Sequence, residues 1–158
     1  MTMSAEDMVF TFCSNVVFVP WIALMFAPKW KYTTPVTNAV VLISCIVYTI
    51  SFGQHALGHK DGLMSMYANM GTLDGLAKMF EERAVLLPVW VHFLAFDLVA
   101  AHYIVQKNLK DGNGISQLAM APCVFFFMMA GPVGMLMYIV IRNARDLVDG
   151  NSMSHKIA

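Results

Sequence analysis

Apolar residues dominate four long runs of the chain, and polar residues gather between the runs. The runs cover about residues 8–28, 36–53, 85–106 and 117–141. Each run is long enough to cross about 30 Å of hydrocarbon as a helix. The strict alternation of a membrane β-strand is absent, and in lipid a helix satisfies its own backbone hydrogen bonds. The pattern therefore predicts an all-α, four-helix transmembrane bundle that forms one integral membrane domain over residues 1–158.

Three connections join these runs, and they differ in length. Residues 27–35 and 107–115 are short, which predicts that runs one and two, and runs three and four, are antiparallel neighbours. Residues 54–84 are longer and mix apolar, polar and glycine positions. The apolar residues at helical spacing in this stretch are Leu73, Leu76, Ala77 and Phe80. We therefore expect an interfacial amphipathic segment between the second and third runs.

The fourth run contains the sequence Gly131-Pro132-Val133-Gly134. Proline removes a backbone donor and kinks a helix, whereas small residues let a neighbouring helix approach closely. The fourth helix is therefore predicted to bend at this point and to pack closely there.

Four spans are an even number, which predicts that both termini lie on one side of the membrane. The basic residues predicted on that side are Lys60, Lys78, Arg83, Arg142, Arg145 and Lys156, and those predicted on the other side are Lys29, Lys31, Lys107 and Lys110. Because neither side shows a clear excess close to the helix ends, the positive-inside rule leaves the orientation open.

The composition excludes several classes of protein. Of the 158 residues, 58% are hydrophobic and 13% are charged, and the mean hydropathy is +0.62, which is typical of an integral membrane protein. Ten Lys and Arg balance ten Asp and Glu, so no basic surface is expected for nucleic acid. The first residues lack the features of a signal or transit peptide. We expect a bacterial inner membrane or, after removal of a targeting segment, a plastid membrane.

One carboxylate interrupts the third apolar run, at Asp97. Inserting such a charge into a bilayer costs on the order of 3 kcal/mol, so it is expected to have a partner or a task. His92, Asp97 and His102 are five residues apart, which places them about 140° from one another on a helix and not on one face. Asp97 and His92 are candidate catalytic residues. The alternative is a buried polar contact that only locks helices together.

His55 and His59 lie four residues apart near the end of the second run. This spacing puts two imidazoles on one helix face, which suits a metal ion. Gly53 and Gly58 weaken the expectation of a continuous helix here. The two histidines are therefore weak candidates for metal ligands.

Several motifs occur in an order that resembles one known family. They are Ala27-Pro28-Lys29, Leu73-Asp74-Gly75-Leu76-Ala77-Lys78-Met79-Phe80, Trp90-Val91-His92 followed by Asp97-Leu98, and Pro132-Val133-Gly134. The combination, between about residues 8 and 145, resembles the small membrane family named for the abscisic-acid-deficient plant protein needed to make neoxanthin. Plant members act on violaxanthin in plastid membranes, so the resemblance implies a xanthophyll or related polyisoprenoid ligand. His102 stands where an Arg is expected in plant relatives, which leaves open how the polar end of the substrate is bound.

The resemblance implies an isomerase that acts on the epoxidised end ring of a xanthophyll. Conversion of the epoxide to an allenic alcohol needs no electrons, only a proton given to the epoxide oxygen and another removed from the neighbouring polyene carbon. No cofactor is therefore expected. Asp97 and His92 are the expected acid–base pair. The substrate-binding residues that the resemblance suggests are Trp90, Lys78, Met79, Phe80, His102, Pro132 and Gly134.

Two other functions remain open from the sequence. A metal-dependent carotenoid or lipid oxidoreductase would use His55, His59 and His92 as ligands. A non-catalytic carotenoid-binding or assembly subunit would use Asp97 and His92 only to brace helices. The expected partners are a carotenoid or other polyisoprenoid lipid and the membrane, and a homo-oligomer or association with other membrane proteins is left open.

Overall fold

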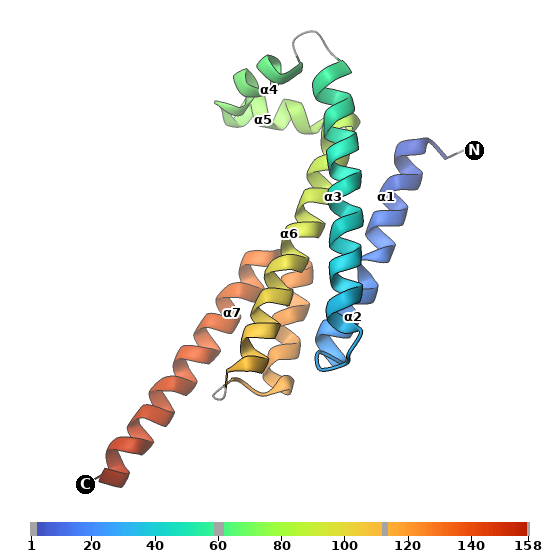
Figure 1. The fold of residues 1–158 in the computed structure, drawn as a ribbon. Helices are drawn as coiled ribbons and strands as arrows, with labels where there is room; N and C mark the ends of the chain where they lie inside the picture. Colours follow the sequence, from blue (N-terminus) through green and yellow to red (C-terminus); the bar gives the residue numbers. More distant parts are fainter. Residues whose placement is uncertain (1–2, 59–61, 112–113, 158) are drawn as a thin grey trace. The chain divides into compact units, whose positions relative to one another are not determined.

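The computed structural model describes residues 3–58, 62–111 and 114–157 of the chain. Within these ranges every regular element is an α-helix (Figure 1). The helices are α1 Ala5–Val16, α2 Phe18–Phe26, α3 Thr33–Gly58, α4 Gly62–Met70, α5 Leu73–Phe80, α6 Arg83–Lys110 and α7 Gln117–Ile157. The predicted all-α class is confirmed.

Four helical segments are long and apolar enough to span a membrane, in agreement with the four predicted runs. They are Ala5–Phe26, Thr33–Gly58, Arg83–Lys110 and Gln117–Val148. The first segment consists of α1 and α2, which are separated at Val17. The chain is therefore an integral membrane protein.

The long connection between the second and third segments contains α4 and α5. These two helices contact each other and lie near the end of α3 and the start of α6 (Figure 1). Thr72 begins α5, because its hydroxyl oxygen accepts a hydrogen bond from the backbone N–H of Gly75 at 3.1 Å. Met79 is buried, whereas Leu73 and Phe80 are exposed. Apolar side chains of α5 are thus available to a membrane surface, as the amphipathic pattern predicts.

Contacts between residues divide the chain into two compact units. Unit 1 comprises Met1–Val17 and Asn38–Phe96, and unit 2 comprises Phe18–Thr37 and Asp97–Ala158. Helices α3 and α6 therefore contribute one part to each unit. The core of unit 1 includes Cys13, Val40, Val85, Val91 and Ala95, and that of unit 2 includes Trp21, Leu24, Leu98, Val105, Met120 and Val124.

Hydroxyl side chains within the apolar helices bond to the backbone of their own helix. Thr37 Oγ1 donates to the carbonyl of Thr33 at 2.7 Å, and Ser44 Oγ donates to the carbonyl of Val40 at 2.9 Å. Both hydroxyls belong to buried residues. Since hydrocarbon offers no partner, these bonds let a span carry small polar residues without leaving them unpaired.

Helix α7 bends sharply near its middle, as residues 131–134 predicted. Ala130 has non-helical backbone angles, with φ −158° and ψ 77°. Two residues later, Pro132 has no N–H to donate to the carbonyl four residues before it. The break in the helix is thus placed where the backbone already lacks a donor.

The two limbs of α7, residues 117–129 and 131–148, lie back to back (Figure 1). A Cβ atom on Gly134 would lie 2.6 Å from the carbonyl oxygen of Cys123 and 2.7 Å from Cα of Phe127. The second limb therefore touches the backbone of the first, and only glycine allows this approach. The predicted close packing at this site is confirmed.

Because the second limb of α7 runs back along the first, its end lies beside the connection between α6 and α7. Arg142 forms an ion pair with the carboxylate of Asp111, and Arg145 donates to the backbone carbonyl of Gly114. The prediction that both arginines lie opposite the lysines at the end of α6 is therefore wrong. The prediction assumes that the fourth apolar run is a straight helix that crosses the membrane once, whereas α7 bends at Ala130 and returns.

Unit 2 packs the bend of α7 against the carboxylate of Asp97. A Cβ atom on Gly131 would lie 2.8 Å from Cγ of Asp97 and nearer still to Oδ1. Gly131 is buried and Asp97 is half-buried. Since a side chain at position 131 would overlap the carboxylate, the bend and the position of Asp97 depend on each other.

Replacement of Gly131 by alanine tests this packing. We expect Gly131→Ala to lower the free energy of unfolding by about 1–3 kcal/mol, because the added methyl group overlaps the Asp97 carboxylate. Gly53→Ala is the matched control, since no atom lies within 4 Å of a Cβ atom there and alanine favours the helix by up to about 1 kcal/mol. Thermal unfolding in detergent measures both. Equal unfolding temperatures for the two variants would contradict the contact.

The return of α7 predicts that its two ends face the same aqueous side. In a variant without the native cysteines, Ser116→Cys and Asp146→Cys should react with a membrane-impermeant thiol reagent from one side, because Arg145 contacts Gly114. Reaction of the two cysteines from opposite sides would show that α7 crosses once.

Candidate functional site

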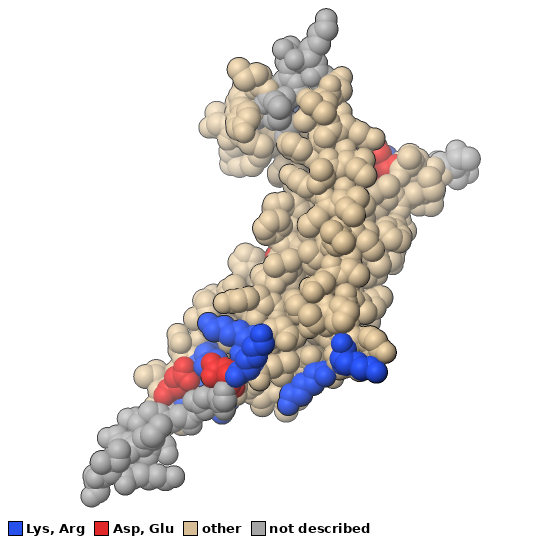
Figure 2. Space-filling view, in the orientation of Figure 1, with Lys and Arg blue, Asp and Glu red and all other residues tan. Residues whose placement is uncertain are grey.

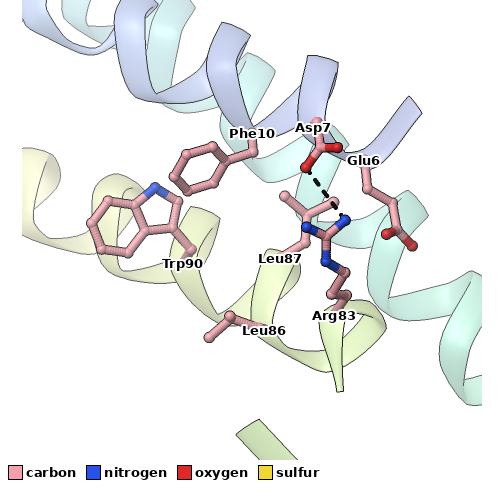
Figure 3. Close-up of a pocket in the computed structure, with 7 residues that line it drawn as sticks. All are labelled: Glu6, Asp7, Phe10, Arg83, Leu86, Leu87 and Trp90. Atoms are coloured by element: carbon pink, nitrogen blue, oxygen red, sulfur yellow. Dashed lines mark ion pairs between the residues drawn. The ribbon is translucent and has the colours of Figure 1, made fainter. Parts of the chain in front are cut away.

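Unit 1 contains a cavity of about 390 Å³ between α1 and the start of α6 (Figure 3). Four of its lining residues are apolar and three are charged. The lining residues are Glu6, Asp7, Phe10, Arg83, Leu86, Leu87 and Trp90. A cavity with apolar walls and a few polar groups is the usual form of a small-molecule site in proteins.

The N-terminal cap of α1 positions Asp7 at this cavity. Ser4 precedes the helix, and its hydroxyl oxygen accepts from the backbone N–H of Asp7 at 3.1 Å. The same hydroxyl donates to Oδ2 of Asp7 at 2.8 Å. One carboxylate oxygen is thus held by the cap, and Oδ1 is turned to Arg83.

Arg83 lies 3.5 Å from Asp7, measured from Nη1 to Oδ1 (Figure 3). Both side chains are well exposed, at 69% for Arg83 and 44% for Asp7. An ion pair of this kind contributes little to stability in water. The pair can therefore exchange its mutual contact for polar groups of a ligand at small cost.

Trp90 forms the aromatic wall of the cavity. Its indole Nε1 donates to Oγ of Ser14 at 3.0 Å, and its ring centroid lies 5.9 Å from that of Phe10. The hydrogen bond and the ring contact fix the indole plane between α1 and α6. The structure thus places the predicted binding residue Trp90 at a cavity.

His92 lies two residues after Trp90, about 200° around α6, and therefore on another face of the helix. Its imidazole is stacked on Phe96 with ring centroids 4.4 Å apart, and Tyr48 lies 5.7 Å away. His92 is exposed in unit 1. A basic nitrogen among aromatic rings at an exposed position can meet an apolar ligand with a reactive polar group.

Asp97 belongs to unit 2, together with other predicted site residues. His102 is half-buried, and its Nε2 lies 3.3 Å from Oγ1 of Thr34 at the start of α3. Pro132 and Gly134 belong to the bend of α7. Unit 2 therefore contains Asp97, His102 and the bend of α7.

The remaining predicted site residues belong to the connection between α3 and α6. Lys78 and Phe80 are exposed on α5, and Met79 is buried. His55 is half-buried near the end of α3. His59 lies outside the described residues, so the suggested pair of metal ligands stays a prediction.

The charged residues of the cavity are not among the site residues that the sequence predicts. Glu6 and Asp7 precede the first apolar run and Arg83 precedes the third, where charges ordinarily mark the ends of membrane spans. The one local signal was the spacing of Ser4 and Asp7, which is typical of a helix start. That spacing predicts where a helix begins, but it does not predict that Arg83 lies beside Asp7.

Comparison with known proteins identifies a family. The model of the ABA DEFICIENT 4-like family matches residues 8–138. Neither a curated protein nor a solved structure matches the chain. The match covers Trp90, His92, Asp97 and the bend of α7, which are the residues that the motifs singled out. The chain is a membrane protein that belongs to the ABA DEFICIENT 4-like family.

Proposed function

We propose that the protein isomerises the epoxidised end ring of a xanthophyll or a related polyisoprenoid. The observation that carries this proposal is the cavity of unit 1, because it joins apolar walls to hydrogen-bonding groups. A xanthophyll end ring likewise combines apolar and polar parts, because its hydrocarbon ring carries a hydroxyl and an epoxide. Membership of the ABA DEFICIENT 4-like family supports the choice of this ligand class.

The polar groups of the cavity suit an uncharged, oxygen-bearing ring. Arg83 can donate to an oxygen, and Glu6 and Asp7 can accept from a hydroxyl. The two carboxylates outnumber the one guanidinium, which disfavours an anionic ligand. Phe10, Leu87 and Trp90 provide the apolar contact for the ring and the start of the polyene.

The proposed reaction rearranges one ring without a change in oxidation level. An acid gives a proton to the epoxide oxygen, and the bond between that oxygen and the ring carbon next to the polyene breaks. A base takes the proton from the adjacent polyene carbon, and an allene forms. The oxygen stays on the other ring carbon as a hydroxyl. One proton enters and one leaves, so substrate and product have equal mass.

Asp97 and His92 are the residues proposed for this proton transfer. Both belong to α6, and neither lines the cavity of unit 1, so the cavity is proposed for ligand binding only. A carboxyl group and an imidazole are the two side-chain types that most often act as general acid and base near neutral pH. The exposed imidazole among aromatic rings supports a role for His92, and the half-buried carboxylate in an apolar segment supports one for Asp97.

Expression in a host that makes violaxanthin tests the reaction. The wild-type chain should yield a product of unchanged mass, and Asp97→Asn or His92→Gln should lower its formation by about 100-fold or more. Asp146→Asn is the control, because this exposed carboxylate lies at the end of the second limb of α7. Chromatography with mass spectrometry at matched protein level measures the product. Full conversion by Asp97→Asn would refute its part in the chemistry.

Filling the cavity tests where the ligand binds. Leu87→Trp places a large ring among the lining residues and should reduce co-purified carotenoid several-fold. Leu42→Trp on α3 is the control, because Leu42 is exposed and is not part of the cavity. Absorbance of the bound pigment per mole of protein gives the occupancy. Undiminished pigment in Leu87→Trp would exclude this cavity as the binding site, whereas bound pigment that is never converted would indicate a binding protein.

A further inference from the structure

Unit 2 carries more basic than acidic residues. Its described side chains include six Lys and Arg, at Lys29, Lys31, Lys107, Lys110, Arg142 and Arg145, and three Asp, at Asp97, Asp111 and Asp146. Figure 2 shows the basic side chains in groups beside the α2–α3 connection and the end of α6. The return of α7 adds its two arginines to the latter group.

The acidic residues near the end of α6 are already paired. Asp111 binds Arg142, and Asp146 lies 3.5 Å from Nε of the same arginine. In the portion of the chain that the structure describes, Lys107 and Lys110 form no ion pair. Their positive charges are therefore not neutralised by the nearby carboxylates.

A second cavity, of about 420 Å³, lies beside these two lysines. Tyr103, Gln106, Lys107 and Lys110 line it from one face of α6, and Asp111 lines its end. The two ammonium groups and the amide are hydrogen-bond donors that suit an anionic head group. The carboxylate that could repel this anion is held by Arg142.

We propose that this cavity binds the anionic head group of a membrane lipid. The position favours a lipid over a soluble anion, because the cavity lies in the last two turns of a membrane-spanning helix. Tyr103, which is 65% exposed, stands one turn inside the lysines, where an aromatic ring contacts the glycerol and upper acyl region. Lysines at the end of a span are attracted to anionic lipid surfaces. This inference does not depend on the proposed reaction.

Native mass spectrometry of the purified full chain in detergent tests the proposal. The probes are phosphatidylglycerol, phosphatidylcholine and inorganic phosphate, each titrated separately. We expect phosphatidylglycerol to bind at least about tenfold more tightly than phosphatidylcholine, and Lys107→Gln/Lys110→Gln to remove this preference, at about fivefold per lysine. Lys29→Gln/Lys31→Gln is the matched control, because it removes the same charge from the α2–α3 connection, outside the cavity.

The outcomes separate the possible sources of binding. Loss of the preference in the α6 double variant, with its retention in the control, supports the site. Equal binding of the two lipids by the wild-type chain would overturn the proposal, as would an equal loss in both double variants, which would show only diffuse charge. Inorganic phosphate that displaces phosphatidylglycerol at equal concentration would assign the cavity to soluble anions and overturn the lipid assignment.

Discussion

Hydrocarbon offers no hydrogen-bond partner, and this constraint governs where polar groups and helix breaks can lie in the chain. Small hydroxyl side chains meet it by bonding to the carbonyl four residues earlier, as Thr37 and Ser44 do. A carboxylate and a broken helix cannot be accommodated in that way. The structure places them together, with Asp97 against the glycine that follows the break at Ala130. Gly131 is buried against this carboxylate, whereas Ala130 and Pro132 on either side of it are exposed.

The polar groups proposed for function differ in exposure between the two units. In unit 1, the ion pair of Asp7 and Arg83 stands at the mouth of an apolar cavity, and the imidazole of His92 is exposed among aromatic rings. In unit 2, Asp97 is held by packing, and the charged groups gather where α6 ends. Binding of the proposed ligand in unit 1 therefore needs little rearrangement of the fold, whereas a change at Asp97 also alters the bend of α7.

Hydrophobic run lengths were sufficient to predict the helical class and the four apolar segments, because the thickness of the hydrocarbon fixes the length of a span. The bend at residues 131–134 was also predictable, since it follows from local proline and glycine chemistry. The direction of the chain after the bend was not predictable. It depends on the contact of Gly134 with Cys123 and Phe127, and hydropathy carries no information about such a contact. The cavity was not predictable either, because tertiary packing is what places Arg83 beside Asp7.

The return of α7 also orders the events of membrane insertion. Asp97 precedes Gly131 in the chain, so its carboxylate leaves the ribosome before the glycine that packs against it. Arg142 and Arg145 need not cross the hydrocarbon, since they contact Asp111 and Gly114 in the connection between α6 and α7. The environment of Asp97 is therefore complete only once the bend of α7 has formed.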